Sequence, residues 1–84
     1  MIAYVQVTGH PTRVGVICGR RVGMAVVRNR ARRLVKEAWR GLSPRVQDGF
    51  DVVVVARPEI RGAGLAAVRT DLATILAAGG VMDG

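Results

Sequence analysis

The sequence predicts a small α/β fold of the sandwich-like α+β kind, in which a sheet and two helices share one core. Three short apolar segments have the length and composition of β-strands, at residues 2–7, 13–18 and 51–56. A long amphipathic helical pattern separates the second from the third, and another helical pattern follows the third. Because half of the 84 residues are hydrophobic, we expect one domain, residues 1–84, with a modest core.

The strand segments differ in how they end. The turn-forming run Gly9-His10-Pro11-Thr12 separates the first two, so residues 13–18 are predicted to be the partner strand of a hairpin. The third, Asp51–Ala56, is an unbroken apolar run, which is typical of a strand buried on both faces. Pro58 is expected to end it.

The central helix is predicted from two opposed faces. At about 100° per residue, an apolar stripe forms from Val27, Ala31, Leu34, Val35 and Ala38, with Trp39 at its edge as a core residue. The opposite face is almost purely cationic, and it holds Asn29, Arg30, Arg32, Arg33, Lys36 and Arg40. Gly41, and then Ser43-Pro44, are expected to end this helix.

The last helix is predicted from the apolar spacing of Leu65, Val68, Leu72, Ile75 and Leu76. Gly79-Gly80 is expected to stop it, and the tail 81–84 is expected to fray.

The net charge of +7 is concentrated in one place. Eight of the thirteen basic residues lie between Arg20 and Arg40, where Glu37 is the one acid, and the remaining sequence is neutral. Like-charged neighbours one turn apart, such as Arg28 and Arg32, each cost roughly a few tenths of a kcal/mol. A helix that tolerates this repulsion is expected to bind an anionic partner that neutralises it.

Several classes of protein are disfavoured by what the sequence lacks. It has no apolar run of bilayer length and no signal peptide, so we expect a cytoplasmic protein without membrane association. Cys18 is alone and lies in an apolar run, which predicts a buried thiol. No paired carboxylates, zinc-ligand spacing or histidine pair is visible, so we predict no catalytic residue and no metal site, with His10 exposed and inert.

The central segment identifies a family. The pattern Gly23-x-Ala25-Val26-x-Arg28-Asn29-Arg30-x-Arg32-Arg33-x-x-Lys36-Glu37 closely resembles the signature of the bacterial ribonuclease P protein subunit. Before it, Arg13-Val14-Gly15 and Arg20-Arg21 resemble the strand and basic loop of that family, and after it Phe50–Arg57 resembles its last strand. The resemblance extends from about Tyr4 to Ile75.

The resemblance implies a mixed sheet, four-stranded in the family, with a left-handed β-α-β crossover through the basic helix, an exception to the usual right-handed rule. It also implies an RNA-binding subunit of ribonuclease P, partnered by ribonuclease P RNA and by the 5′ leader of precursor tRNA. Hydrolysis then resides in the RNA subunit, which requires Mg²⁺, while the protein alone binds no cofactor.

The resemblance, with the charge pattern, also assigns site residues. RNA contact is expected at Arg20, Arg21, Arg28, Asn29, Arg30, Arg32, Arg33, Lys36 and Arg40. Tyr4 and Arg57 are expected in the leader cleft; Tyr4 would stack on a base there, or else be a half-buried strand residue.

The chain departs from the family pattern in three places. The basic N-terminal helix and first strand of the family are lacking, so we expect an N-terminally truncated member with an exposed sheet edge through which it could self-associate. Met24 stands where the family has asparagine, and residues 16–19 replace its serine-containing strand.

Two other functions stay open on the residues alone. A stand-alone RNA- or DNA-binding module could also carry a cationic helix, although strands rather than a second helix flank this one. An independent protein ribonuclease is disfavoured because general acid and base candidates are lacking.

Overall fold

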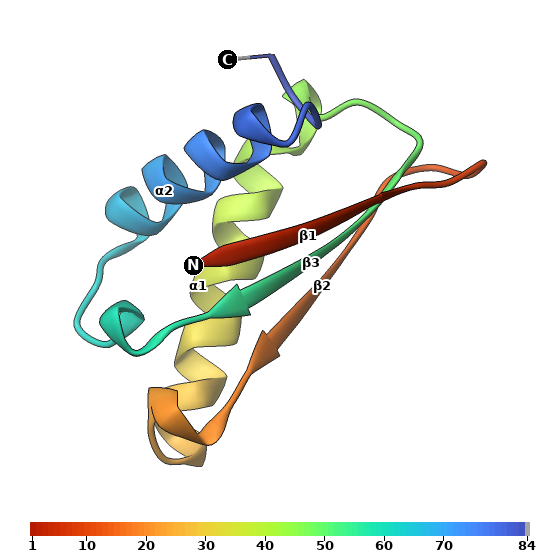
Figure 1. Ribbon diagram of the computed structural model, residues 1–84. Coiled ribbons are helices and arrows are strands. Elements are labelled where there is room, and N and C mark those ends of the chain that lie inside the picture. Colours follow the sequence, from red (N-terminus) through yellow and green to blue (C-terminus); the bar gives the residue numbers. More distant parts are fainter. Residues whose placement is uncertain (84) are drawn as a thin grey trace.

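The computed structural model describes residues 1–83. Its strands and helices, shown in Figure 1, are β1 (Ile2–Val7), β2 (Arg13–Cys18), α1 (Ala25–Leu42), β3 (Phe50–Ala56) and α2 (Leu65–Ala78). Short 3₁₀ turns, η1, η2 and η3, lie at Arg20–Val22, Ser43–Arg45 and Pro58–Ile60. The predicted elements are thus present, and β3 begins one residue earlier than expected.

The sheet is mixed and three-stranded in the described residues. Its order is β1-β3-β2, with β1 antiparallel and β2 parallel to β3. Viewed from the open face of the sheet with β2 and β3 pointing upward, β3 lies to the right of β2 and α1 lies behind the sheet (Figure 1). The β2–α1–β3 connection is therefore left-handed, as the family resemblance implied.

The predicted hairpin between the first two strands is wrong, because β3 lies between them. Hydrogen bonds hold the β1–β2 connection to the start of β3: Thr8 N donates to Gly49 O at 2.7 Å, and Phe50 N donates to Thr12 Oγ1 at 3.1 Å. Thr12 Oγ1 in turn donates to Gln47 O at 2.5 Å. The most apolar strand thereby gains a hydrogen-bonding partner on both edges, and β1 and β2 become the edges of the sheet.

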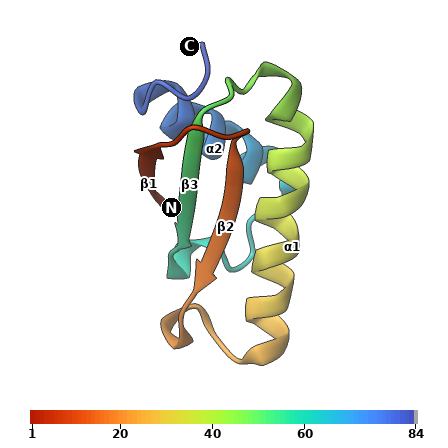
Figure 2. The same ribbon diagram turned by 90° about the vertical axis from the view of Figure 1, so that its right-hand side faces the viewer.

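The expectation that the third strand is buried on both faces is also wrong. Val52, Val54 and Ala56 are buried, whereas Val53 and Val55 are partly exposed. The reason is that α1 and α2 both pack on one face of the sheet, so that Figure 2 shows the sheet on the left and α1 on the right. The other face has no covering layer in the described residues.

The core lies between that covered face and the two helices. Buried side chains come from α1 (Ala31, Val35, Ala38 and Leu42), from α2 (Val68, Leu72 and Leu76) and from β3, with Cys18 and Val22 beside them. Trp39 is partly buried against this core, as expected.

Gly41 does not end α1, which continues to Leu42. A Cβ at Gly41 would lie 3.1 Å from Arg69 Cζ, at the far end of an exposed and flexible side chain. Arg69 Nη2 donates to Gly41 O at 3.3 Å. Gly41 thus joins an α1–α2 contact through its carbonyl and does not end the helix.

The tail beyond α2 is packed rather than frayed through Met82. Val81 and Met82 are buried, Gln47 N donates to Val81 O at 2.8 Å, and Val46 forms a β-bridge with Met82. Gly80, with φ of 76°, makes the turn that brings them back. The last residue of the predicted frayed tail, Gly84, lies outside the described residues.

Neither α1 nor α2 combines the length and apolar character needed to span a bilayer, and this holds for every helix of residues 1–83.

Candidate RNA interface

The entry into α1 places two arginines beside its N-terminus. Val22 is buried and anchors η1, and Val22 N donates to Gly19 O at 3.1 Å. Gly23 then turns the chain with φ of 147°, and a Cβ there would lie 3.0 Å from Val27 Cγ1. Arg20 and Arg21 are left exposed on the surface of this turn.

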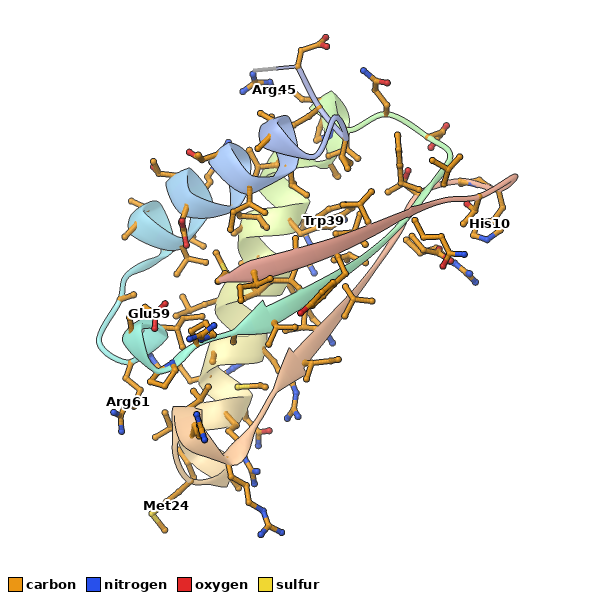
Figure 3. The ribbon with its side chains drawn as sticks, in the orientation of Figure 1. His10, Met24, Trp39, Arg45, Glu59 and Arg61 are labelled. Carbon is orange, nitrogen blue, oxygen red and sulfur yellow. The ribbon has the colours of Figure 1, made fainter. Side chains whose placement is uncertain are left out.

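The first turn of α1 carries no acidic residue and has no side-chain cap. The partial positive charge of the helix N-terminus is therefore uncompensated by the protein. Met24 sits at this tip and is 82% exposed (Figure 3). Charge and exposure at this end both favour an anionic partner.

The predicted cationic residues of α1 fall into two groups. Arg28 and Arg32 border the buried stripe on the side of Trp39 and are partly buried, while Asn29, Arg30, Arg33, Lys36 and Arg40 are exposed. The Nε of Arg28 is buried without a hydrogen-bond partner among the described residues. This donor is out of reach of an external phosphate, so a phosphate contact of Arg28 would be made by the accessible part of its partly buried side chain.

Intramolecular contacts take up little of this charge. Arg32 Nη1 donates to Asn29 Oδ1 at 3.4 Å, and Arg40 Nη1 donates to Glu37 Oε1 at 3.0 Å. Both partners of the second contact are well exposed, so the pair is worth little in water. The face remains strongly cationic.

The open face of the sheet presents Tyr4. Its side chain is 63% exposed, so the alternative of a half-buried tyrosine is wrong. In register, Tyr4 pairs with Val53, and Val53 pairs with Gly15 on its other side. A Cβ at Gly15 would meet nothing within 4 Å, so the sheet surface two strands away from Tyr4 is open. An exposed aromatic ring can stack on a nucleobase.

Arg57 joins the basic loop rather than standing apart. It follows β3 and lines a groove of ≈ 270 Å³ together with Arg20 and Arg21. Ile17 and Val55 contribute apolar lining on the same side. In the sequence these arginines belong to two separate segments. Ile17 and Val55 could not be identified from the sequence as groove residues, because their exposure depends on the sheet order.

The other end of the open face is ion-paired. Arg13 Nε donates to Asp51 Oδ1 at 3.1 Å and Arg13 Nη2 to Asp51 Oδ2 at 3.2 Å. His10 is exposed, as expected, yet its Nε2 lies 3.9 Å from Asp51 Oδ2. In Figure 3 this histidine lies at the tip of the β1–β2 connection, far from Met24 and α1's N-terminus.

Asp51 should show a lowered pKa. The hydrogen bond from Arg13 is the main cause, and the positive charges of Arg13 and His10 act in the same direction. A carboxyl with a lowered folded-state pKa stabilises the fold above its ordinary pKa, and that contribution disappears as pH falls through the lowered value. We expect an NMR titration of the Asp51 carboxyl to have its midpoint below 3.8, the ordinary value.

The matched control is Arg13→Ala, which should move that midpoint back up. An Asp51 midpoint that is the same in both proteins would contradict the ion pair.

Within residues 1–83 no group of three or more histidine, cysteine or acidic side chains is placed to hold a metal ion. The chemistry that the described surface offers is binding: forked cations for phosphates and one exposed ring for a base.

Sequence comparison points to one family. The family model for ribonuclease P matches residues 1–78. The ribonuclease P protein component of Symbiobacterium thermophilum is 58% identical over 52 residues, which cover 62% of this chain and 45% of that protein. The protein component of Chloroflexus aurantiacus is 46% identical over 65 residues, covering 76% and 48%. The chain spans about half the length of the curated relatives it matches.

Solved structures agree. The ribonuclease P protein of Thermotoga maritima superposes with a TM-score of 0.80 at 28% identity, over 88% of this chain and 72% of that one. The protein of Staphylococcus aureus gives a TM-score of 0.83 at 20% identity, over 96% and 75%, which shows a shared fold. The cationic helix, the left-handed crossover and the match over residues 1–78 establish that this chain belongs to the ribonuclease P protein family.

Proposed function

We propose that this chain is the RNA-binding subunit of a cytoplasmic ribonuclease P and assists the catalytic RNA in removing the 5′ leader of precursor tRNA. The observation that carries the proposal is the cationic surface of α1, which is nearly free of intramolecular neutralisation, in a member of this family. Catalysis is assigned to the RNA subunit with its Mg²⁺, and this chain contributes binding.

Phosphate binding by α1 is the first part of the proposal. Guanidinium groups donate two parallel hydrogen bonds to a phosphate, and Arg28, Arg32 and Arg33 offer such forks along the helix. Asn29 and the cations Lys36 and Arg40 extend the contact, with Arg20 and Arg21 continuing it past the helix N-terminus. Charge on this face also reduces the repulsion between two RNA molecules, and so lowers the Mg²⁺ concentration that their association needs.

Leader binding on the open sheet face is the second part. A single strand of RNA would stack a base on Tyr4 and place phosphates at the groove of Arg20, Arg21 and Arg57. The sheet face is apolar between these points, where Ile17 and Val55 lie.

The two RNA partners give separable experiments. Ribonuclease P RNA should bind this chain more tightly than double-stranded DNA of the same length at the same salt concentration, as measured by fluorescence anisotropy. Equal affinity for both would favour a stand-alone basic nucleic-acid-binding module. Salt dependence alone would not distinguish them, because every phosphate binder shows it.

Tyr4→Ala tests the leader contact. We expect it to weaken binding of precursor tRNA to the reconstituted holoenzyme by about 10-fold, since stacking of one base is worth about 1–3 kcal/mol. Tyr4→Phe keeps the ring and should bind as the wild type does. Binding of mature tRNA, which has no leader, should be the same for all three proteins; a loss there would show that Tyr4 acts on the fold or on another RNA segment.

The outer edges of β1 and β2 pair with no further strand within residues 1–83, so self-association through a sheet edge is also part of the proposal. Sedimentation at increasing protein concentration would reveal it as a rising mass, and a constant monomer mass would contradict it.

A further inference from the structure

Arg30 differs from its neighbours on α1 because its guanidinium is directed to the protein. Arg30 Nη2 donates to Ala63 O at 3.0 Å. Ala63 lies in the connection between η3 and α2, 33 residues further along the chain. Arg30 therefore links α1 to the segment that follows β3.

That segment is a compact run of turns that begins at Arg57. Ile60 N donates to Arg57 O at 3.0 Å, and Ala63 N donates to Ile60 O at 3.1 Å. Ile60 is buried in the core and fixes the middle of the run. Three consecutive hydrogen bonds thus connect the Arg30 side chain to Ala63, then to Ile60, and then to Arg57.

The start of this run forms one wall of the cationic groove. Arg57 and Pro58 line the groove together with Arg20 and Arg21, and η3 packs against η1. Holding Ala63 therefore helps to hold the groove wall that carries Arg57.

We propose that Arg30 is a positioning residue, which orients Arg57 toward the single-stranded leader by anchoring the 57–63 segment to α1. The inference rests on the proposed function and deepens it, because it divides the arginine-asparagine-arginine motif into two roles. Arg28, whose Nε has no partner in the described residues, is assigned to RNA contact, whereas Arg30 acts through Arg57.

A second contact of the same chemistry provides a control. Arg69 of α2 donates to the carbonyl of Gly41 near the other end of α1, at 3.3 Å. It also joins the two helices through an arginine and a backbone carbonyl, but it is not part of the run that leads to Arg57. Removing it tests whether any loosening of α2 produces the same effect.

The first measurement is amide hydrogen exchange of the free chain. Arg30→Met keeps the aliphatic stem and removes the donor, so the amides of Ile60 and Ala63 should exchange several-fold faster. Arg69→Met should leave those two amides unchanged. Unchanged exchange in Arg30→Met would overturn the proposal without reference to any RNA.

The second measurement is a double-mutant cycle on precursor tRNA binding to the holoenzyme reconstituted from ribonuclease P RNA and this chain. Arg30→Met and Arg57→Ala should each weaken binding by about 5-fold, and the double variant by about the same factor, because both remove one contact. The salt dependence should likewise fall by about one single-strand phosphate contact, a slope of about 0.7, in all three variants.

Additive losses, about 25-fold in the double variant with a slope lowered by about two contacts, would show that Arg30 binds phosphate itself and would overturn the proposal. Coupling of Arg69→Met with Arg57→Ala would overturn it too, because the effect would then be general loosening. If the wild-type chain does not raise the affinity of the holoenzyme for precursor tRNA, both the proposed function and this inference are wrong. If the wild-type chain does raise it but the losses of the two variants add, only this inference is wrong.

Discussion

Replacing Arg28 and Arg33 together with alanine should weaken binding of ribonuclease P RNA by about 100-fold at physiological salt, since each lost charge-assisted contact is worth about 1.5 kcal/mol. The two residues lie on different sides of the cationic helix, one beside the buried stripe and one fully on the surface. The slope of log affinity against log salt concentration should fall by about 1.5 to 2, because two phosphate contacts are lost. Fluorescence anisotropy across a salt series measures both quantities.

The matched control for this result is Arg45→Ala. Arg45 is exposed on η2, at the opposite end of the molecule from Met24 (Figure 3), and its replacement lowers the net charge by one, against two in the double variant. It should change affinity by less than about 3-fold. If the loss of affinity for each charge removed were the same at Arg45 as on α1, only the overall charge would matter. The interface assigned to α1 would then be wrong.

Leu72→Ala should lower the free energy of unfolding by about 3 kcal/mol, because deleting a fully buried leucine leaves a cavity as well as losing transfer energy. Leu72 is 0% exposed between α2 and the rest of the core. Chemical denaturation followed by circular dichroism gives the value. In an 84-residue domain such a loss removes a large share of the total stability.

Leu65→Ala, on the same helix, is the control for core position. Leu65 is 44% exposed at the first turn of α2, so the same substitution should cost only about 1 kcal/mol or less. If the two variants were equally destabilised, the face of α2 that packs against the core would not be the one that carries Leu72.

The elements of the fold could be predicted from the sequence because each has a local signal. The stripe of Ala31, Val35 and Ala38 recurs at helical spacing, and glycines mark the end of α2. Sheet order has no such signal: a short loop between two strands favours a hairpin. In the structure, Thr8 and Thr12 of that loop instead form hydrogen bonds with residues 47–50, and β3 lies between the two strands. The handedness of the crossover came from the family resemblance, since the general rule predicts the opposite hand.

The candidate site also has one part that the sequence predicts and another that depends on contacts between distant segments. The cationic face of α1 follows from spacing along one helix, so its residues can be named from the sequence alone. The groove that joins Arg57 to Arg20 and Arg21 depends on two strands ending side by side, which only the parallel pairing of β2 with β3 produces. The contact between Arg30 and Ala63 is equally non-local, and the sequence places Arg30 with the other cations because it cannot show where a side chain finds an acceptor.

The RNA-binding role of α1 is tested most directly by cleavage of precursor tRNA with a bacterial ribonuclease P RNA at low Mg²⁺, with this chain, without it, and with the Arg28→Ala/Arg33→Ala variant. We expect that the wild-type chain stimulates release of the 5′ leader, that the variant largely loses this stimulation, and that the chain without the RNA cleaves nothing. Stimulation that is equal for both proteins, or cleavage by the chain alone, would contradict this role.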